Sequence, residues 1–177
     1  MQQGDLKKDF FAFLGLPIAF DLDPEVLEDN YRTLQKYLHP DKFSASTEQE
    51  KRMAVQLTAH LNEAHATLSN PMHRGRYLLA MQGIDTNEET DTVMPAAFLM
   101  EQMEIREQLE GLDSADDPWA KLDALGAMIG KKTNDRVQGL SKAFAAKDFR
   151  GARGIVREMQ FLHKLQDEIE LTEERLS

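Results

Sequence analysis

Apolar residues recur at helical spacing along most of the chain, and no segment alternates apolar and polar residues as a half-buried strand does. The apolar residues 9–14 predict a short helix that ends at Gly15. The next helix is predicted to begin at Asp23 and Pro24, because aspartate caps a helix and proline suits its first position. This helix should run to about Leu38. Its predicted buried face is Val26, Leu27, Tyr31, Leu34 and Leu38.

Prolines mark where the following helices begin and end. The residue before a proline is pushed out of helical conformation, so the helix should break at His39, before Pro40. A third helix and a capping box are predicted after a polar stretch, and a fourth helix spans about residues 71–82. The candidates for the cap are Ser46 or Thr47, with Gln49 or Glu50 as its partner. The third helix should bury Ala54, Leu57, Leu61, Ala64 and Leu68.

The second half of the chain predicts three more helices. Residues 84–97 are polar and acidic and include Pro95, which makes them the best candidate for a linker. Helices are predicted over about 96–112, 119–146 and 148–175. Because short turns connect them, they favour an antiparallel three-helix bundle, and the fold class is all-α. The predicted buried stripes of the last two helices are Trp119, Leu122, Leu125, Ile129, Leu140 and Phe144, followed by Ile155, Met159, Leu162, Leu165 and Ile169.

The helix over 96–112 carries apolar residues on two faces. One stripe suits the core of the bundle and consists of Phe98, Gln102, Ile105, Leu109 and Leu112. Other apolar residues fall on the opposite side, and one aromatic residue lies off the stripe of the last helix. Leu99, Met100, Met103 and Phe161 would then form an exposed apolar patch beside Glu104, Glu107 and Glu110, as is typical of partner sites. The alternative is that this helix buries both faces as core.

The charge of the chain narrows the classes of partner. The formal net charge is −10, with 9 basic and 11 acidic residues in 1–83 and 12 basic and 20 acidic residues in 84–177. So acidic a chain argues against nucleic acid as a partner. No apolar run approaches the roughly 20 residues of a membrane helix, and the first residues lack a signal-peptide pattern. We therefore expect no membrane contact and a cytoplasmic location. The chain has no cysteine, so it cannot ligate a metal cluster through thiolates.

The tripeptide His39-Pro40-Asp41 is the strongest candidate for a docking site. It lies in a polar loop between two amphipathic helices, where proline limits the loop's entropy and the imidazole and carboxylate offer directional hydrogen bonds. The alternative is that the tripeptide only ends a helix. A bare tripeptide match is a weak signal, so its context decides its meaning.

That context resembles the J-domain family. The matching segments are FFAFLGL at 10–16, YRTLQKYLHPDK at 31–42 and NEAHATLSNPMHR at 62–74. The resemblance implies that His39, Pro40 and Asp41 trigger ATP hydrolysis by a DnaK-type chaperone. It also implies that the basic residues Arg32 and Lys36, with Lys42 nearby, dock on that chaperone. The alternative for Arg32 and Lys36 is a solvated ladder of charges with Glu28. Glu25, Glu28 and Asp29 make the first half of this helix acidic, which favours a dedicated chaperone partner.

The second half resembles the HscB family of iron–sulfur cluster co-chaperones. The similar segments are GRYLL at 75–79, FLMEQMEIRE at 98–107 and FLHKL at 161–165. The resemblance implies a J-domain over 1–77, a connecting helix end and linker over 78–97, and a helical bundle over 98–177, arranged as an L. It further implies that the bundle binds the scaffold protein IscU and delivers it to the chaperone HscA, without a cofactor. Leu99, Met100, Met103, Glu104, Glu107 and Phe161 would be the scaffold-binding residues.

Two other functions compete with this one. A general J-domain protein would bind unfolded clients through its bundle, and a purely structural helical module would carry the tripeptide by chance. An enzyme is not expected, because the sequence has neither a phosphate-binding loop nor a nucleophile elbow. His60 and His65 are five residues apart, and a helical metal site favours a spacing of four, so no metal is expected.

Overall fold

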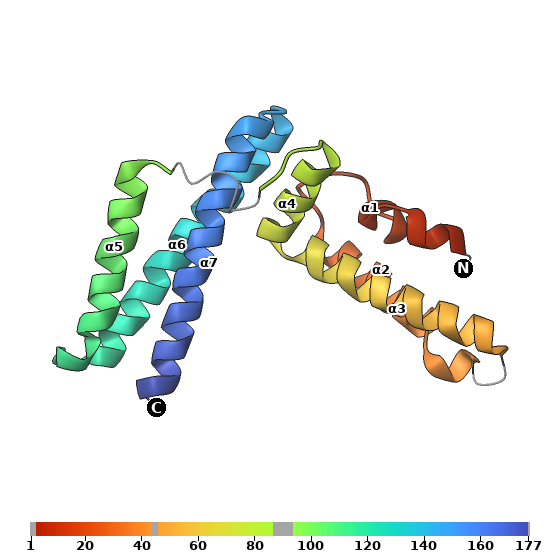
Figure 1. Cartoon of the computed structure of the whole chain (residues 1–177), viewed down its shortest axis with the longest axis horizontal. Coiled ribbons are helices and arrows are strands. Elements are labelled where there is room, and N and C mark those ends of the chain that lie inside the picture. The colour runs from red at the N-terminus through yellow and green to blue at the C-terminus, as the bar shows by residue number, and fades with distance from the viewer. Residues whose placement is uncertain (1–2, 44–45, 87–93, 177) are drawn as a thin grey trace. The chain divides into compact units, whose positions relative to one another are not determined.

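The computed structural model describes residues 3–43, 46–86 and 94–176, without the side chains of residues 3, 4, 40, 113 and 114. Within these ranges every regular element is a helix, which confirms the all-α prediction (Figure 1). The chain divides into two compact units, Met1–Met81 and Gln82–Ser177.

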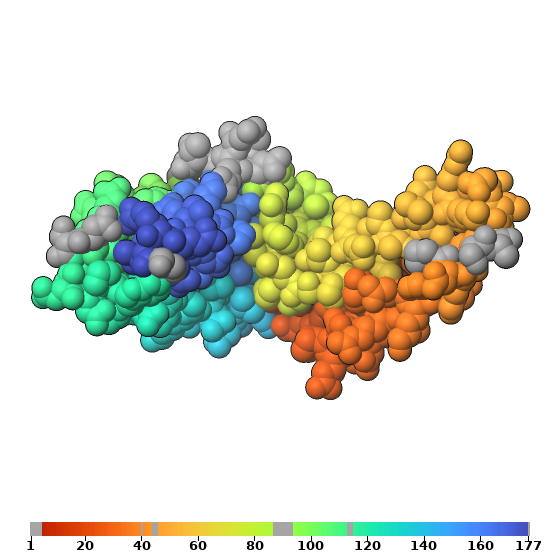
Figure 2. All heavy atoms as spheres, turned by 90° about the horizontal axis from the view of Figure 1, so that it is seen from below, coloured from red at the N-terminus to blue at the C-terminus, as the bar shows by residue number. Residues whose placement is uncertain are grey.

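Within its described residues, the first unit contains four α-helices. They are α1 (Phe10–Phe13), α2 (Pro24–Tyr37), α3 (Glu48–Ser69) and α4 (Pro71–Met81), after a short 3-10 helix, η1 (Gln3–Lys7). The predicted caps are present: Asp23 Oδ1 accepts from the Glu25 N–H at 2.9 Å, and Thr47 and Glu50 form a capping box. The α2 and α3 helices run antiparallel, because Tyr31 bonds Asn62 and Glu28 bonds His65 across them. Figure 2 shows the orange and yellow side chains of this hairpin along the surface of the unit.

Aromatic contacts join the beginning of the first unit to its end. The Phe10 ring stacks on Tyr77 of α4 with centroids 4.5 Å apart, and the Phe10 N–H donates to Tyr77 Oη at 3.0 Å. Burial raises the pKa of Tyr77 above its usual value of 10.0. The largest fully buried side chains of this unit are Phe11, Leu14, Leu61, Leu68 and Leu79. All five residues predicted for the buried face of α3 are buried.

The second unit is an up-down-up bundle. It consists of α5 (Ala96–Glu110), the 3-10 helix η4 (Gly111–Ser114), α6 (Pro118–Ala145) and α7 (Phe149–Leu176). Ion pairs set the register: Glu101 with Lys132 joins α5 to α6, Arg106 with Glu168 joins α5 to α7, and Arg136 with Glu158 joins α6 to α7. One cluster of its apolar core consists of Ile105, Leu109, Leu112, Leu122, Leu125, Ile129, Leu165 and Ile169.

Two of the predicted core residues are exposed instead. Val26 is 45% exposed because it lies about 100° around the helix from Leu27, the residue that α2 buries. Trp119 is also 45% exposed, because it follows Pro118 in the first turn of α6, at the end of the bundle. Ile155 is only half buried, although it faces Gly139 closely enough for a Cβ there to lie 3.2 Å from its Cδ1. The neighbouring Val156 is fully buried.

The start of the predicted linker is packed on α7. Arg153 Nε donates to the Asp85 carbonyl oxygen at 2.8 Å, and Gln160 Nε2 donates to the Thr86 carbonyl oxygen at 3.4 Å. Thr86 is buried by this contact. Residues 87–93 of the linker lie outside the described residues, and the boundaries 1–77, 78–97 and 98–177 stay a prediction.

Candidate functional site

The tripeptide His39-Pro40-Asp41 forms a tight turn at the end of the α2–α3 hairpin. The turn is a 3-10 helix, η2 (Pro40–Phe43), in which the Lys42 N–H donates to the His39 carbonyl oxygen at 3.0 Å. His39 Nδ1 accepts from the Asp41 N–H at 3.3 Å and lies 3.5 Å from Asp41 Oδ2. Both side chains are exposed. The backbone therefore holds the imidazole and the carboxylate next to each other in solvent.

Arg32, the first of the predicted docking cations, is already paired. Its Nε donates to Glu28 Oε1 at 2.7 Å, while Glu28 Oε2 lies 3.1 Å from His65 Nε2 on α3. The hydrogen bond from Arg32, and after it the one from His65, holds the pKa of Glu28 below its usual 4.5. The His65 ring also stacks on Tyr31 at 4.0 Å. The contact between Glu28 and Arg32 is the one that the charge-ladder alternative predicts, and docking by Arg32 stays a prediction.

The other two predicted cations are differently placed. Lys36 is exposed in the last turn of α2, where it makes no ion pair with a residue that the structure describes. Lys42 Nζ lies 5.9 Å from the centre of the Tyr37 ring, a cation–π distance. The exposed Tyr37 thus holds Lys42 beside the turn, a contact that the sequence analysis did not foresee.

A shallow groove of about 480 Å³ opens beside this turn. Val55 on its wall is prominently exposed, and Lys51 contributes the charge at its edge. The remaining lining residues are Leu38, Phe43, Ala54, Thr58, Ala59 and Asn62. The groove extends the candidate docking surface from the turn onto α3.

The outer face of α5 exposes three large apolar side chains. Leu99 is 38%, Met100 62% and Met103 61% exposed. The predicted core stripe of the same helix, from Phe98 to Leu112, is buried. The helix therefore buries one face and leaves a second apolar face in solvent. The two-face pattern was visible in the sequence, and the alternative that both faces are core is wrong.

Phe161 of α7 lies next to this face. Its ring meets Phe98 edge-on at 5.9 Å, and Lys164 Nζ lies 5.7 Å from its centre. Phe161 is half buried, so part of its side chain is exposed to solvent. Glu104 and Glu107 are exposed on α5, as predicted for an acidic rim. Their role in binding a scaffold stays a prediction.

Gln102 lies on the buried face of α5, opposite the exposed apolar face. The sequence predicts it only as a member of the core stripe. It is 1% exposed, and neither its Nε2 nor its Oε1 has a hydrogen-bond partner among the residues that the structure describes. A buried amide without partners destabilises the packing around it. Sequence periodicity places Gln102 in the core but cannot show that its amide lacks partners.

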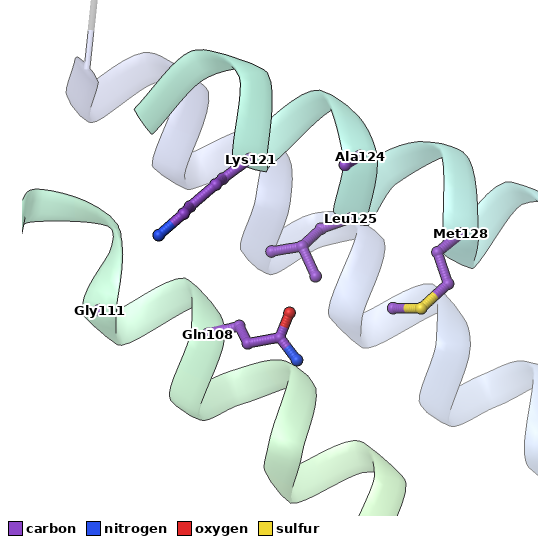
Figure 3. A pocket seen from close by; sticks show the side chains of 6 residues that line it. All are labelled: Gln108, Gly111, Lys121, Ala124, Leu125 and Met128. Carbon is purple, nitrogen blue, oxygen red and sulfur yellow. The ribbon is translucent and has the colours of Figure 1, made fainter. Parts of the chain in front are cut away.

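A second pocket lies on the opposite flank of α5. It has a volume of about 370 Å³ and opens between α5 and α6, where Gln108 points towards Leu125 and Met128 (Figure 3). Lys121 extends towards the last turn of α5 (Figure 3). Its positive charge interacts favourably with the carbonyl groups at the C-terminal end of that helix. Gly111 and Ala124 complete its lining. Lys121 is the only ionisable side chain among these lining residues.

Two features of the described ranges bear on metal binding and on membrane insertion. No group of three or more histidine, aspartate or glutamate side chains there could hold a metal ion. None of the helices there is both long and apolar enough to span a membrane.

Comparisons with known proteins place this arrangement in a family. Residues 94–170 match the family model described as the HSCB C-terminal oligomerisation domain. The co-chaperone protein HscB homolog of Vibrio cholerae serotype O1 is 39% identical over 168 residues, which cover 95% of this chain and 98% of that protein. The corresponding protein of Shewanella amazonensis is 40% identical over 171 residues, with the same two coverages.

Solved structures agree with the sequence relatives. The chaperone HscB from Vibrio cholerae superposes with a TM-score of 0.86 at 37% identity, covering 96% of this chain and all of that one. The crystal structure of human co-chaperone protein HscB gives a TM-score of 0.86 at 31% identity, covering 94% of this chain and 82% of that chain. With relatives at this identity over nearly its whole length, the chain belongs to the HscB family of co-chaperones.

Proposed function

We propose that this protein binds the iron–sulfur scaffold protein IscU, delivers it to the DnaK-type chaperone HscA and stimulates the ATPase of HscA. In this role it assists the maturation of iron–sulfur proteins in the cytoplasm without catalysing a reaction itself. The observation that carries the proposal is the presence of two exposed sites in two compact units: the His39–Asp41 turn in one and the apolar face of α5 in the other.

The turn supplies the contact with the chaperone. His39 and Asp41 are solvent-exposed and fixed by the η2 backbone, so little conformational entropy is lost when a partner binds them. Pro40 begins this 3-10 helix, while Lys36, Lys42 and Arg32 place positive charge along the adjoining surface. Exposed cations at a rim mainly accelerate association and select the partner. We therefore assign ATPase stimulation to the turn and steering to the cations.

The α5 face supplies the contact with the scaffold. Leu99, Met100, Met103 and Phe161 offer apolar area, and Glu104 and Glu107 select a partner with basic side chains. Full burial of one such apolar side chain contributes about 1.5–3 kcal/mol. Association costs of similar total size leave a modest affinity, which suits a carrier that must release its client.

ATP turnover by HscA tests the first contact. The wild-type protein should accelerate steady-state hydrolysis, and His39→Gln should abolish that acceleration with unchanged helical circular dichroism. His163→Gln is the matched control, because His163 is an exposed histidine on α7 in the other unit. Stimulation by His39→Gln equal to that by the wild type would refute the role of the turn.

Binding of IscU tests the second contact. Leu99→Ala, Met103→Ala and Phe161→Ala should each weaken IscU binding in calorimetry while helix content stays the same. Val55→Ala removes a comparably exposed aliphatic side chain from the first unit and should leave IscU affinity unchanged. Unaltered affinity in all three α5–α7 variants would exclude this face as the IscU site.

A general J-domain protein is the second candidate, because an exposed apolar helix face also suits unfolded clients. An unfolded peptide that competes with IscU for the α5 face would favour this function. Selective binding of folded IscU, with no competition by the peptide, would favour the dedicated adaptor.

A further inference from the structure

An exposed leucine on α7 has no role in the function proposed so far. Leu171 is 65% exposed, more than Leu99, Met100 or Met103, although it lies in the middle of the last turns of a long helix. Exposed single leucines are ordinary on protein surfaces. The position of Leu171 relative to α5 makes this one significant.

The contacts between α5 and α7 place Leu171 on the same flank of the bundle as Phe161. The two helices run parallel, because Phe98 in the first turn of α5 meets Phe161 in the middle of α7, and Arg106 pairs with Glu168 about two turns further along both helices. Residues seven apart share a helix face. Leu171 therefore lies on the face of Lys164, the residue whose ammonium group covers Phe161. It continues the α5–α7 seam beyond the ion pair between Arg106 and Glu168.

The acidic residues of α5 extend further along this seam than its apolar residues do. The exposed apolar side chains of α5 end at Met103, whereas exposed glutamates continue through Glu107 to Glu110. Glu110 is four residues after Arg106, and Leu171 is three residues after Glu168, so the two lie at similar heights on neighbouring helices. A partner that reaches the last glutamate also reaches Leu171.

The length of the seam fits one interface. Phe161 and Leu171 are ten residues apart, about 15 Å along the helix at 1.5 Å per residue. A standard protein interface buries about 800 Å² on each partner, a patch about 30 Å across. The apolar patch and Leu171 therefore fit under a single partner.

We propose that Leu171 is a second apolar contact for the scaffold, so that the binding surface runs along the α5–α7 seam from Leu99 to Leu171. The inference rests on the proposed function and extends the same site. This surface fits a folded partner that has two apolar regions, one for the patch around Leu99 and one for Leu171. Basic side chains on the partner lie between these two regions. Those basic side chains meet Glu107 and Glu110, while the ion pair between Arg106 and Glu168 holds the two helices together between the apolar contacts.

Calorimetric titration with IscU tests the proposal with single substitutions. Leu171→Ala should weaken binding about threefold to tenfold, within the range of a peripheral apolar contact. Because Leu171 is exposed, its truncation should not change the thermal unfolding midpoint. Val55→Ala is the control. Tenfold weakening by Leu99→Ala with no effect of Leu171→Ala would overturn the extension and leave the proposed function standing. Unchanged affinity in Leu171→Ala and also in Leu99→Ala, Met103→Ala and Phe161→Ala would overturn both.

A fluorescent probe gives an independent readout. The chain has no cysteine, so Leu171→Cys provides a single thiol that can be labelled with a polarity-sensitive fluorophore before IscU is added. A blue shift on binding, absent when Val55→Cys is labelled in the same way, supports burial of position 171. An unchanged spectrum at saturating IscU would overturn the proposal, because a residue in the interface must change its environment.

Discussion

Glu28 holds Arg32 at a distance of 2.7 Å between Oε1 and Nε, and this pairing reduces the positive charge that α2 presents to a partner. The same carboxylate contacts His65, so α2 and α3 share it. The positive surface of α2 is thereby displaced towards Lys36 and Lys42, next to the His39–Asp41 turn. Glu28 thus determines how much of the charge of Arg32 is available for docking.

Neutralising Glu28 should strengthen chaperone binding. Glu28→Gln keeps an acceptor for Arg32 but removes the opposing charge, so affinity for an acidic chaperone surface should rise about twofold to fivefold at low salt and less at high salt. Surface plasmon resonance with immobilised HscA at two salt concentrations measures this effect. Glu174→Gln makes the same change of net charge in the other unit. An equal gain in that control would show that only net charge matters.

Acid should destabilise the first unit through identifiable carboxylates. The hydrogen bonds from Arg32 and His65 lower the pKa of Glu28 below 4.5, and those from the Thr47 backbone and side chain lower the pKa of Glu50. The unfolded state then binds more protons below pH 4.5, so the stabilisation is present above that pH and is lost as pH falls through the folded-state values.

Glu50→Gln isolates one of these contributions, because glutamine can keep the capping contact without titrating. In urea unfolding, the variant should lose less stability than the wild type between about pH 5 and pH 3. Identical losses in the two proteins would show that Glu50 is not linked to acid unfolding.

Thr47 should be a strong contributor to α3. Thr47→Ala removes the cap whose side chain accepts from the Glu50 N–H, and the free energy of unfolding should fall by about 0.5–2 kcal/mol. Thr58→Ala is the control within the same helix, because its hydroxyl only donates to the Ala54 carbonyl oxygen, which the helix already satisfies. Equal destabilisation by both substitutions in urea unfolding would contradict the capping role.

Replacing Gln102 should stabilise the bundle. Gln102→Met has nearly the same volume and removes a buried amide whose two polar atoms have no partner among the described residues, so the free energy of unfolding should rise by about 1–3 kcal/mol. Gln166→Met on the partly exposed side of α7 should change stability by less than about 0.5 kcal/mol. Destabilisation by Gln102→Met would show that the amide makes a useful contact in solution.

Local sequence rules predicted the helices well because their signals are local. Thr47 and Glu50 are three residues apart, and the buried stripe of α3 repeats over about four turns, so both features can be read without the rest of the fold. The prediction that Val26 is buried was wrong, because the sequence does not distinguish an aliphatic residue beside a buried stripe from a residue within it. The prediction that Trp119 is buried was wrong, because the period of apolar residues does not show where a helical bundle ends.

The features of the candidate sites also differ in whether they depend on local sequence or on tertiary packing. His39-Pro40-Asp41 is contiguous, and the second apolar face of α5 follows from one helical period, so both were predictable. The contact between Glu28 and His65 joins residues 37 positions apart, and it requires the placement of α2 against α3. The amide of Gln102, which has no hydrogen-bond partner among the described residues, likewise depends on the packed bundle.

The contact between Phe10 and Tyr77 also bears on the order in which the two units fold during translation. It spans 67 residues, so the first unit can close only after α4 has left the ribosome. The second unit cannot close until α7, at the far end of the chain, has followed. Because domains fold as units during synthesis, the part with the His39–Asp41 turn matures while the part with the α5 face is still being translated. The His39–Asp41 turn is therefore in place on a nascent chain before the α5 face has formed.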